Sequence, residues 1–322
     1  MKVLLTGGAG FIGSHVADRL VDRGDEVVIL DSFDPFYDPA VKRRNIESSL
    51  ASGKVTLVEC DICDSEALEG AIHDIELEAI VHLAAKAGVR PSLERPLAYV
   101  RTNVDGTQSM LDFARKRGIR PFVFGSSSSV YGDATPVPFR EDASADTPIS
   151  PYAATKRSAE LLCSAHSYLH GASIACLRLF TVYGPRQRPD LAIHKFARLM
   201  LRNEEIPFFG DGSTERDYTY VGDIVDGIER ALDWCVRGDA GAFEIMNLGE
   251  SVTTSLSRLI ELISAELDVT PRLRRLPNQP GDVQRTCADV TRARQLIGYD
   301  PRTNMEEGIH RFVEWLRAQP MT

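Results

Sequence analysis

Short apolar runs alternate with amphipathic stretches through the first half of this 322-residue chain. An amphipathic stretch from about Gly10 to Arg23 predicts the first helix. The apolar runs predict strands at residues 3–5, 27–30, 55–58, 80–83, 122–124 and 173–179. Because these runs are apolar at successive positions, we expect both faces of each strand to be covered. The pattern therefore predicts a doubly wound α/β fold, a parallel sheet wrapped by helices.

The alternation becomes irregular after residue 179, where turns rich in proline and glycine are frequent. We therefore predict a Rossmann-like domain over residues 1–178, with a probable return segment near 216–247, and a smaller C-terminal substrate lobe over 179–322. The proline-rich segment 133–151 predicts a loop beside the site.

Charge and hydrophobicity exclude several classes of function. The net charge is −9, which argues against a nucleic-acid surface, and no apolar run reaches the roughly 18 residues of a membrane span. Met1 lies two residues from the first predicted strand, which leaves no room for a signal peptide. We expect a cytoplasmic protein that binds neither nucleic acid nor membrane.

The six cysteines stand mostly among apolar residues, which favours reduced core side chains over disulfides. Cys60 and Cys63 have the spacing of a metal or redox pair. No second pair of Cys or His stands at ligand spacing, so we predict no metal site.

A glycine-rich turn joins the first strand to the first helix. Gly7 and Gly10 allow a tight turn and a close approach to phosphate, and Gly13 allows the helix to pack on the strand. Phe11 and Ile12 begin the helix, whose backbone N–H groups face a pyrophosphate in such motifs. The spacing, Gly-x-x-Gly-x-x-Gly, differs from the Gly-x-Gly-x-x-Gly of many dehydrogenases, but its position predicts a dinucleotide site.

Asp31 ends the second strand, 18 residues after Gly13. A carboxylate there accepts hydrogen bonds from both ribose hydroxyls and repels a 2′-phosphate, which favours NAD over NADP. Arg43 and Arg44 are the counter-argument, because either could reach a phosphate.

Two more segments follow predicted strands, at the edge of the sheet where ligands of doubly wound folds collect. Asp61 and Ile62 follow the third strand, and Ala84, Ala85 and Lys86 follow the fourth. We predict that both segments contact the cofactor.

Tyr152 and Lys156 stand one helical turn apart. The unperturbed pKa of tyrosine is about 10, but a nearby ammonium and an oxidised nicotinamide ring both favour the phenolate. Such a phenolate can take a proton from a sugar hydroxyl while the cofactor takes the hydride. A run of four serines, Ser126 to Ser129, follows the fifth strand and is expected over the nicotinamide end of the site.

Together these features resemble the extended short-chain dehydrogenase/reductase family, the nucleotide-sugar epimerases and dehydratases. The similarity covers nearly the whole chain and includes the motifs at residues 177–180, 216–218 and 280–283. It implies Ser127 as the catalytic serine, with Ser128 and Ser129 as adjacent alternatives. It further implies Tyr152 as the acid/base and Lys156 as the residue that holds the nicotinamide ribose and lowers the tyrosine pKa. Asn103 matches an asparagine that supports the active-site helix.

Within the family, residues 31–43, 87–90 and 180–190 most resemble the members that epimerise UDP-glucuronate at carbon 4. A uronate carries a carboxylate that an arginine can hold with paired hydrogen bonds. We assign this carboxylate to Arg188 with Thr181, and Arg90 is the second candidate.

The resemblance also implies contacts with the nucleotide. Arg216 matches a pyrophosphate arginine, and Asp282 matches a contact to the nucleotide ribose. Gln279 and Pro280 stand where the family often has an arginine, so one phosphate contact is either missing or supplied by Arg285.

The predicted reaction is NAD-dependent epimerisation of UDP-glucuronate to UDP-galacturonate through a transient 4-keto sugar. A UDP-hexose 4-epimerase and a UDP-glucuronate decarboxylase are the alternatives within the enzyme class. A nucleotide-sensing protein without turnover is the alternative outside it. The family also implies a homodimer formed through the helices near 100–116 and 152–169.

Overall fold

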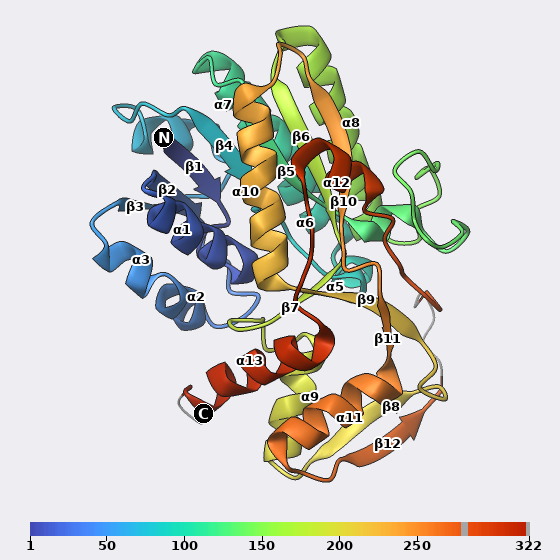
Figure 1. The fold of residues 1–322 in the computed structure, drawn as a ribbon. Coiled ribbons are helices and arrows are strands. Elements are labelled where there is room, and N and C mark those ends of the chain that lie inside the picture. Colours follow the sequence, from blue (N-terminus) through green and yellow to red (C-terminus); the bar gives the residue numbers. More distant parts are fainter. Residues whose placement is uncertain (278–282, 320–322) are drawn as a thin grey trace.

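A parallel seven-stranded sheet forms the centre of the protein (Figure 1). The computed structural model describes residues 1–277 and 283–319. In sheet order the strands are β10 (Phe243–Leu248), β6 (Ser173–Leu179), β5 (Pro121–Ser127), β4 (Ala79–His82), β1 (Lys2–Thr6), β2 (Glu26–Asp31) and β3 (Val55–Glu59). All six predicted runs are strands of this sheet, so the predicted doubly wound α/β fold is confirmed.

Helices cover both faces of the sheet because successive strand residues point to opposite sides. In β1, Val3 and Leu5 pack into one apolar cluster, whereas Leu4 packs into the other. The first cluster lies under α1 (Phe11–Arg23) and α10 (Val221–Arg237). The second lies under α4 (Ser65–Ala71), α7 (Gly106–Lys116) and α8 (Pro151–His170).

The edge strand β3 departs from the expectation of full coverage. Val58 is buried, but Thr56 and Glu59 are exposed. The reason is the position of β3 at the end of the strand order, where one side of the strand has no neighbour in the sheet.

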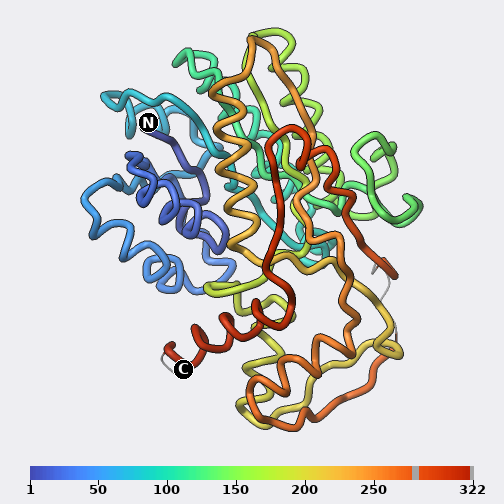
Figure 2. The backbone as a smooth tube through the Cα atoms, in the orientation of Figure 1, coloured from blue at the N-terminus to red at the C-terminus, as the bar shows by residue number. Residues whose placement is uncertain are grey.

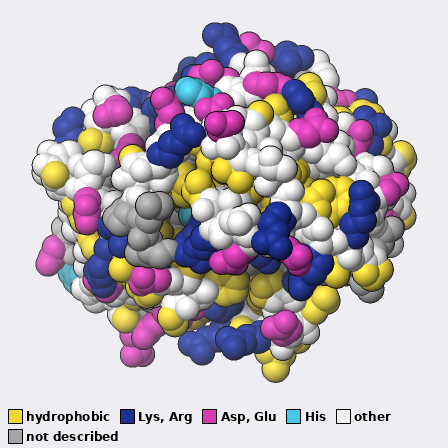
Figure 3. Space-filling view, turned by 90° about the horizontal axis from the view of Figure 1, so that it is seen from below, with side chains coloured by type: hydrophobic (Ala, Val, Ile, Leu, Met, Phe, Trp, Pro, Cys, Tyr) yellow, Lys and Arg dark blue, Asp and Glu magenta, His cyan; other side chains and the backbone are white. Residues whose placement is uncertain are grey.

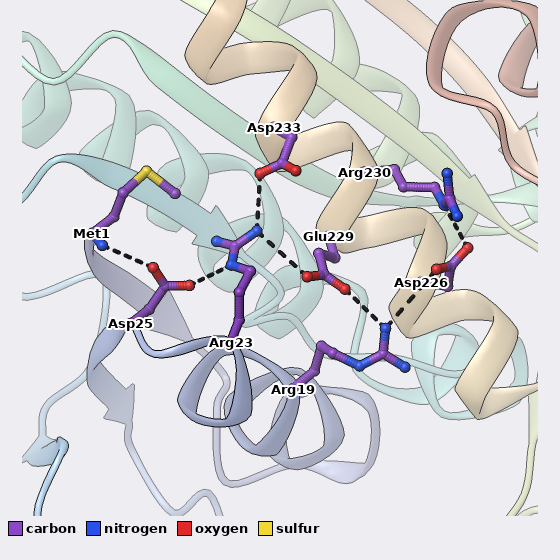
Figure 4. A network of polar contacts seen from close by, with 8 residues as sticks. All are labelled: Met1, Arg19, Arg23, Asp25, Asp226, Glu229, Arg230 and Asp233. Carbon is purple, nitrogen blue, oxygen red and sulfur yellow. Dashed lines mark hydrogen bonds and ion pairs between the residues drawn. The ribbon is translucent and has the colours of Figure 1, made fainter.

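Residues from the predicted return segment complete the sheet. β10 pairs in parallel with β6, and α10 lies alongside α1 (Figure 2). Ion pairs join the two helices: Arg19 binds Glu229 at 2.8 Å and Arg23 binds Asp233 at 2.9 Å (Figure 4). The domain boundary at 178/179 stays a prediction.

Residues of the C-terminal half form a second lobe below the sheet (Figure 1). Its three-stranded sheet consists of β7 (Thr181–Tyr183), β9 (Glu215–Tyr220) and β11 (Thr253–Ser255), and its two-stranded sheet of β8 (Glu205–Phe209) and β12 (Arg272–Leu276). Its helices are α9 (Ala192–Leu201), α11 (Leu256–Leu267) and α13 (Met305–Arg317). Seen from below, acidic and basic side chains are interspersed over this face (Figure 3).

The remaining elements are short. They are α2 (Pro39–Asn45), α3 (Glu47–Ala51), α5 (Val89–Glu94), α6 (Pro96–Val100), the π-helical turn η1 (Arg101–Asp105), the 3-10 turn η2 (Ser128–Tyr131) and α12 (Thr291–Ile297). Among the described residues, no helix has the length and apolar character needed to cross a bilayer. Within the same residues, no cluster of three His, Cys, Asp or Glu side chains could hold a metal ion, and the six cysteines are free.

Candidate active site

The glycine turn has the shape that a pyrophosphate requires. Gly7 has φ +69°, and a Cβ on this residue would lie 2.8 Å from the Ala84 backbone nitrogen. A Cβ on Gly13 would overlap the Gly7 carbonyl oxygen. The first intrahelical bond of α1 is Ser14 N to Gly10 O, at 3.0 Å. The amides of Phe11, Ile12 and Gly13 therefore precede the hydrogen-bonded turns, as in helix N-termini that bind phosphate.

Asp31 lies at the end of β2, where it was predicted, and only 5% of its surface is exposed. One carboxylate oxygen accepts hydrogen bonds from Phe33 N at 2.8 Å and Lys42 Nζ at 3.1 Å. The other accepts from Ala9 N at 3.2 Å, which ties the carboxylate to the glycine turn. Sequence reasoning considered Arg43 and missed Lys42; Arg43 instead pairs with Glu59 at 2.8 Å. This geometry fits the adenosine ribose of NAD.

The segments after β3 and β4 reach the same edge of the sheet. Asp61 accepts a hydrogen bond from Cys63 N at 3.0 Å, and Ile62 is buried. Ala84 N donates to Thr6 Oγ1 at 3.1 Å, and Ala85 is half-buried beside it. Both segments therefore lie at the strand ends, as predicted, and their contacts with NAD stay a prediction.

Asn103 joins the loop after β4 to the active-site helix. Its Oδ1 accepts from Lys86 N at 2.8 Å, and its Nδ2 donates to Lys86 O at 3.0 Å and to Thr155 Oγ1 at 3.0 Å. Asn103 lies in the π-helical turn η1, a distortion frequent at functional sites. The Lys86 ammonium points elsewhere, to Asp34 at 2.8 Å.

Tyr152 and Ser127 come together at the ends of α8 and β5. Ser150 caps α8 by accepting from Ala153 N at 3.2 Å, which fixes the first turn of the helix. The Ser127 hydroxyl hydrogen-bonds to the Tyr152 side chain and accepts from Ser129 Oγ at 2.9 Å. Ser127 is thus the serine in contact with the tyrosine, with Ser129 behind it and Ser128 half-buried at the start of η2.

Lys156 is buried and directed toward the sheet. Its Nζ donates to Gly125 O at 2.6 Å and lies 4.9 Å from the centroid of the Phe124 ring. Burial lowers the pKa of Lys156 to about 8.

Burial and neighbouring groups act in opposite directions on the pKa of Tyr152. Burial raises the pKa of its phenol above the ordinary value, and the hydrogen bond with Ser127 and the charge of Arg188 offset this only in part. The roles predicted for Lys156, holding the nicotinamide ribose and lowering this pKa, stay predictions.

Arg188 lies in a loop after β7, with its side chain 15% exposed. Its guanidinium forms two hydrogen bonds with Asp190, at 3.0 and 2.7 Å, and lies 5.0 Å from the centroid of the Phe36 ring. Thr181 begins β7 and is half-buried. Of the two arginines proposed for a sugar carboxylate, Arg188 is the one whose charge lowers the pKa of the Tyr152 phenol.

The other predicted substrate contacts lie on the C-terminal lobe or next to it. Arg90, on α5, lies 5.5 Å from the centroid of the Phe209 ring in β8. Arg216, on β9, donates to Glu215 O at 2.9 Å. Asp282 lies outside the described residues.

Sequence reasoning missed three side chains of the site. Tyr99 packs edge-to-face on Tyr152 at 6.2 Å, and its hydroxyl donates to Ala87 O at 3.1 Å. Phe36 and Asp190 both contact Arg188. The pattern Arg-x-Asp at 188–190 was the available signal for the last contact.

The chain is similar to proteins whose chemistry fits this arrangement. Residues 3–249 match the family described as "NAD dependent epimerase/dehydratase family". UDP-glucuronate 4-epimerase of Thermodesulfobacterium geofontis is 37% identical over 313 residues, which cover 97% of this chain and 95% of the relative.

Two solved structures are similar over the same length. UDP-glucuronic acid 4-epimerase from Bacillus cereus, in complex with UDP-glucuronic acid and NAD, has a TM-score of 0.91 and 32% identity, covering 98% of this chain and 99% of that one. UDP-glucose 4-epimerase from Thermotoga maritima, with UDP-glucose, has a TM-score of 0.89 and 33% identity, with the same coverage.

The chain belongs to the NAD dependent epimerase/dehydratase family, the extended short-chain dehydrogenase/reductase class that its motifs resemble. Its cofactor is NAD, in agreement with the glycine turn and with Asp31. Within this family the chain is an NAD-dependent nucleotide-sugar 4-epimerase, an isomerase, as its relatives are.

Proposed function

We propose that the protein converts UDP-glucuronate and UDP-galacturonate into one another by epimerisation at carbon 4. The position of Arg188 is the observation that carries this proposal. Its side chain is only 15% exposed and its charge lowers the pKa of the Tyr152 phenol, so in this proposal its guanidinium holds the sugar carboxylate near the reacting hydroxyl. The similarity to two UDP-glucuronate 4-epimerases supports the same substrate.

In this proposal Tyr152 Oη removes the proton from the sugar 4-hydroxyl and later returns it to the same oxygen, when carbon 4 has the inverted configuration. Ser127 orients the phenol through their hydrogen bond and binds the same hydroxyl. NAD, when bound, supplies the redox chemistry by taking a hydride from carbon 4 and returning it. Gly7, Gly10 and the amides of α1 would hold its pyrophosphate, and Asp31 its ribose.

The remaining residues of the site would hold the sugar carboxylate and the nucleotide. A 4-keto hexuronate is a β-keto acid, which loses carbon dioxide when its carboxylate bond stands perpendicular to the ketone plane. Arg188 with Thr181 would hold the carboxylate in an unreactive orientation while the ring turns about its pyrophosphate linkage. On the nucleotide side, Arg216 and Asp282 would bind the pyrophosphate and the ribose.

One observation favours a second candidate, a UDP-hexose 4-epimerase. Arg188 forms an ion pair with Asp190, so this arginine has a partner even when the sugar carries no charge. The similarity to the Thermotoga maritima enzyme is of the same order.

The test is product analysis with UDP-glucuronate and no added cofactor, because tightly held NAD would suffice. UDP-galacturonate as the product supports the proposal. A UDP-pentose would identify a decarboxylase, and turnover of UDP-glucose alone would identify the hexose epimerase. The Tyr152→Phe variant is the control, and we expect it to lose about 10²–10⁴-fold in turnover.

We also propose that the protein is a cytoplasmic homodimer. One of the helices expected at the interface, α8, carries exposed apolar side chains: Tyr168 and Leu169 are 88% and 67% exposed, and Leu97 on the neighbouring α6 is 82% exposed. The six free cysteines suit a reducing compartment. Sedimentation equilibrium tests the oligomer, and a monomer at micromolar concentration would contradict it.

A further inference from the structure

The loop that carries Arg188 has a fixed base. Pro185 O accepts a hydrogen bond from His15 Nε2 at 2.9 Å, and Arg186 pairs with Asp18 at 2.7 Å, so α1 holds the loop on one side. On the other side, His194 Nδ1 donates to Gln187 O at 2.6 Å. The backbone next to Arg188 is therefore anchored to both the cofactor helix and the C-terminal lobe.

From this base, Asp190 holds one particular edge of the guanidinium. Arg188 Nε donates to one carboxylate oxygen at 3.0 Å, and Nη2 donates to the other at 2.7 Å. A guanidinium has five N–H donors in a rigid plane, and this side-on contact uses two of them. The end-on pair, one N–H from each Nη atom, lies at a different edge, where a second carboxylate can bind in the same bidentate way.

The pair also balances charge in a partly buried place. Arg188 is 15% exposed and Asp190 is 41% exposed, so the carboxylate lies nearer to solvent. The guanidinium carbon also lies 5.0 Å from the centroid of the Phe36 ring, a second contact that limits how the group can turn. Thus Asp190 and Phe36 together restrict the direction in which the end-on edge can point.

We propose that Asp190 is a positioning residue that sets the preference of the site for an anionic over a neutral sugar. By occupying the side-on edge of Arg188, Asp190 directs the end-on edge toward the substrate carboxylate. This inference rests on the proposed role of Arg188 as the carboxylate contact. It adds that the acidic neighbour assists that contact and does not compete with it.

The experiment measures binding of UDP-glucuronate and UDP-glucose by calorimetry in the Tyr152→Phe background, which prevents turnover. Asp190→Ala is expected to weaken UDP-glucuronate binding by about ten-fold or more, because a misdirected Arg188 loses its paired contact. UDP-glucose binding should change by less than about two-fold, since this sugar has no carboxylate for Arg188 to hold. Asp190→Asn should fall between, because its amide oxygen still accepts one hydrogen bond.

The chain offers a matched control. Arg140 and Asp142 form the same Arg-x-Asp contact, with both hydrogen bonds at 3.2 Å, but they are 62% and 59% exposed. Asp142→Ala should therefore leave the affinity for both nucleotide sugars unchanged.

Two results would overturn the inference: an unchanged ratio of the two affinities in Asp190→Ala, or tighter binding of UDP-glucuronate. The second result would identify Asp190 as a competitor for Arg188. Turnover of UDP-glucuronate by the unaltered protein tests the proposed function separately. If the unaltered protein turns over UDP-glucuronate but Asp190→Ala leaves the ratio of the two affinities unchanged, only the role of Asp190 is refuted. If the unaltered protein has no such activity, the proposed function is refuted, and the affinity ratio still decides the role of Asp190.

Discussion

Glu160 offers the sharpest test of how the active-site helix is held. This residue stands one turn after Lys156 on α8 and is fully buried. Its carboxylate accepts from Arg178 Nε and Nη2, both at 2.9 Å, and from Ser126 Oγ at 2.6 Å. Arg157 Nη1 approaches at 3.1 Å. These contacts join α8 to β5 and β6, and Ser126 is the neighbour of Ser127 in β5.

We expect Glu160→Gln to lower the free energy of unfolding by about 3–5 kcal/mol. Replacing the carboxylate leaves the charge of Arg178 uncompensated in a position that is 1% exposed, and breaking a buried pair from one side typically costs this much. Arg178 Nη1 already has no hydrogen-bond partner among the described residues, and besides Glu160 the guanidinium faces the Tyr131 ring, whose centroid lies 4.6 Å away. The double variant Glu160→Leu, Arg178→Met should recover much of the loss, because it buries no charge.

The assay is urea unfolding followed by circular dichroism at a fixed NAD concentration. The control is Glu307→Gln, which breaks a 2.7 Å ion pair with Arg311 on the surface of α13. We expect the control to lose only about 0.3–0.5 kcal/mol. A loss in Glu160→Gln below about 1 kcal/mol, close to that of the control, would refute the reasoning.

Three further outcomes are expected. Gly13→Ala should lose bound NAD and lower the free energy of unfolding by about 1–3 kcal/mol, because its Cβ would overlap the Gly7 carbonyl. Gly70→Ala is the control: the space around it is open, so it should keep both NAD and stability. Cofactor absorbance and thermal melts measure the two effects. His82 is buried, and burial lowers its pKa to about 3, so its contribution to stability is complete above about pH 6.5 and is lost as the pH falls toward 3. Urea unfolding at pH 7 and pH 5 should show this slope, and His82→Gln should flatten it; equal slopes would contradict the assignment. Burial lowers the pKa of Lys156 to about 8, so turnover should decline as the pH rises through 8. Lys156→Arg should move this decline to higher pH. A pH profile that is the same in the variant would exclude a role for the ammonium.

The strands of the central sheet were predictable because their apolar runs are local features of the sequence. β10 was harder to locate, since Glu244 and Asn247 interrupt its pattern. Asn247 is fully buried, and it is accommodated by hydrogen bonds from its side chain to Phe139 O and Asp289 O, which are distant in sequence. Such partners can be recognised only after the chain has folded.

The same distinction applies to the site. Side chains at strand ends, such as Asp31 and Ser127, were predictable because parallel strands bring their carboxyl ends to one edge. The direction in which a long side chain points was not predictable from the sequence. Lys156 turns to a carbonyl of β5 and Lys42 turns to Asp31, and each choice depends on packing between separate elements.

β10 comes more than sixty residues after β6 in the sequence, and this separation limits where the chain can be divided. Until residues 243–248 pair with β6, that strand presents an open edge of unpaired backbone groups next to the apolar centre of the sheet. A fragment that ends at residue 178 would keep every element of the glycine turn and still display a strand available for pairing with another copy. The nucleotide-binding half is therefore expected to aggregate when it is produced without residues 243–248, so a fragment designed to bind NAD has to include β10.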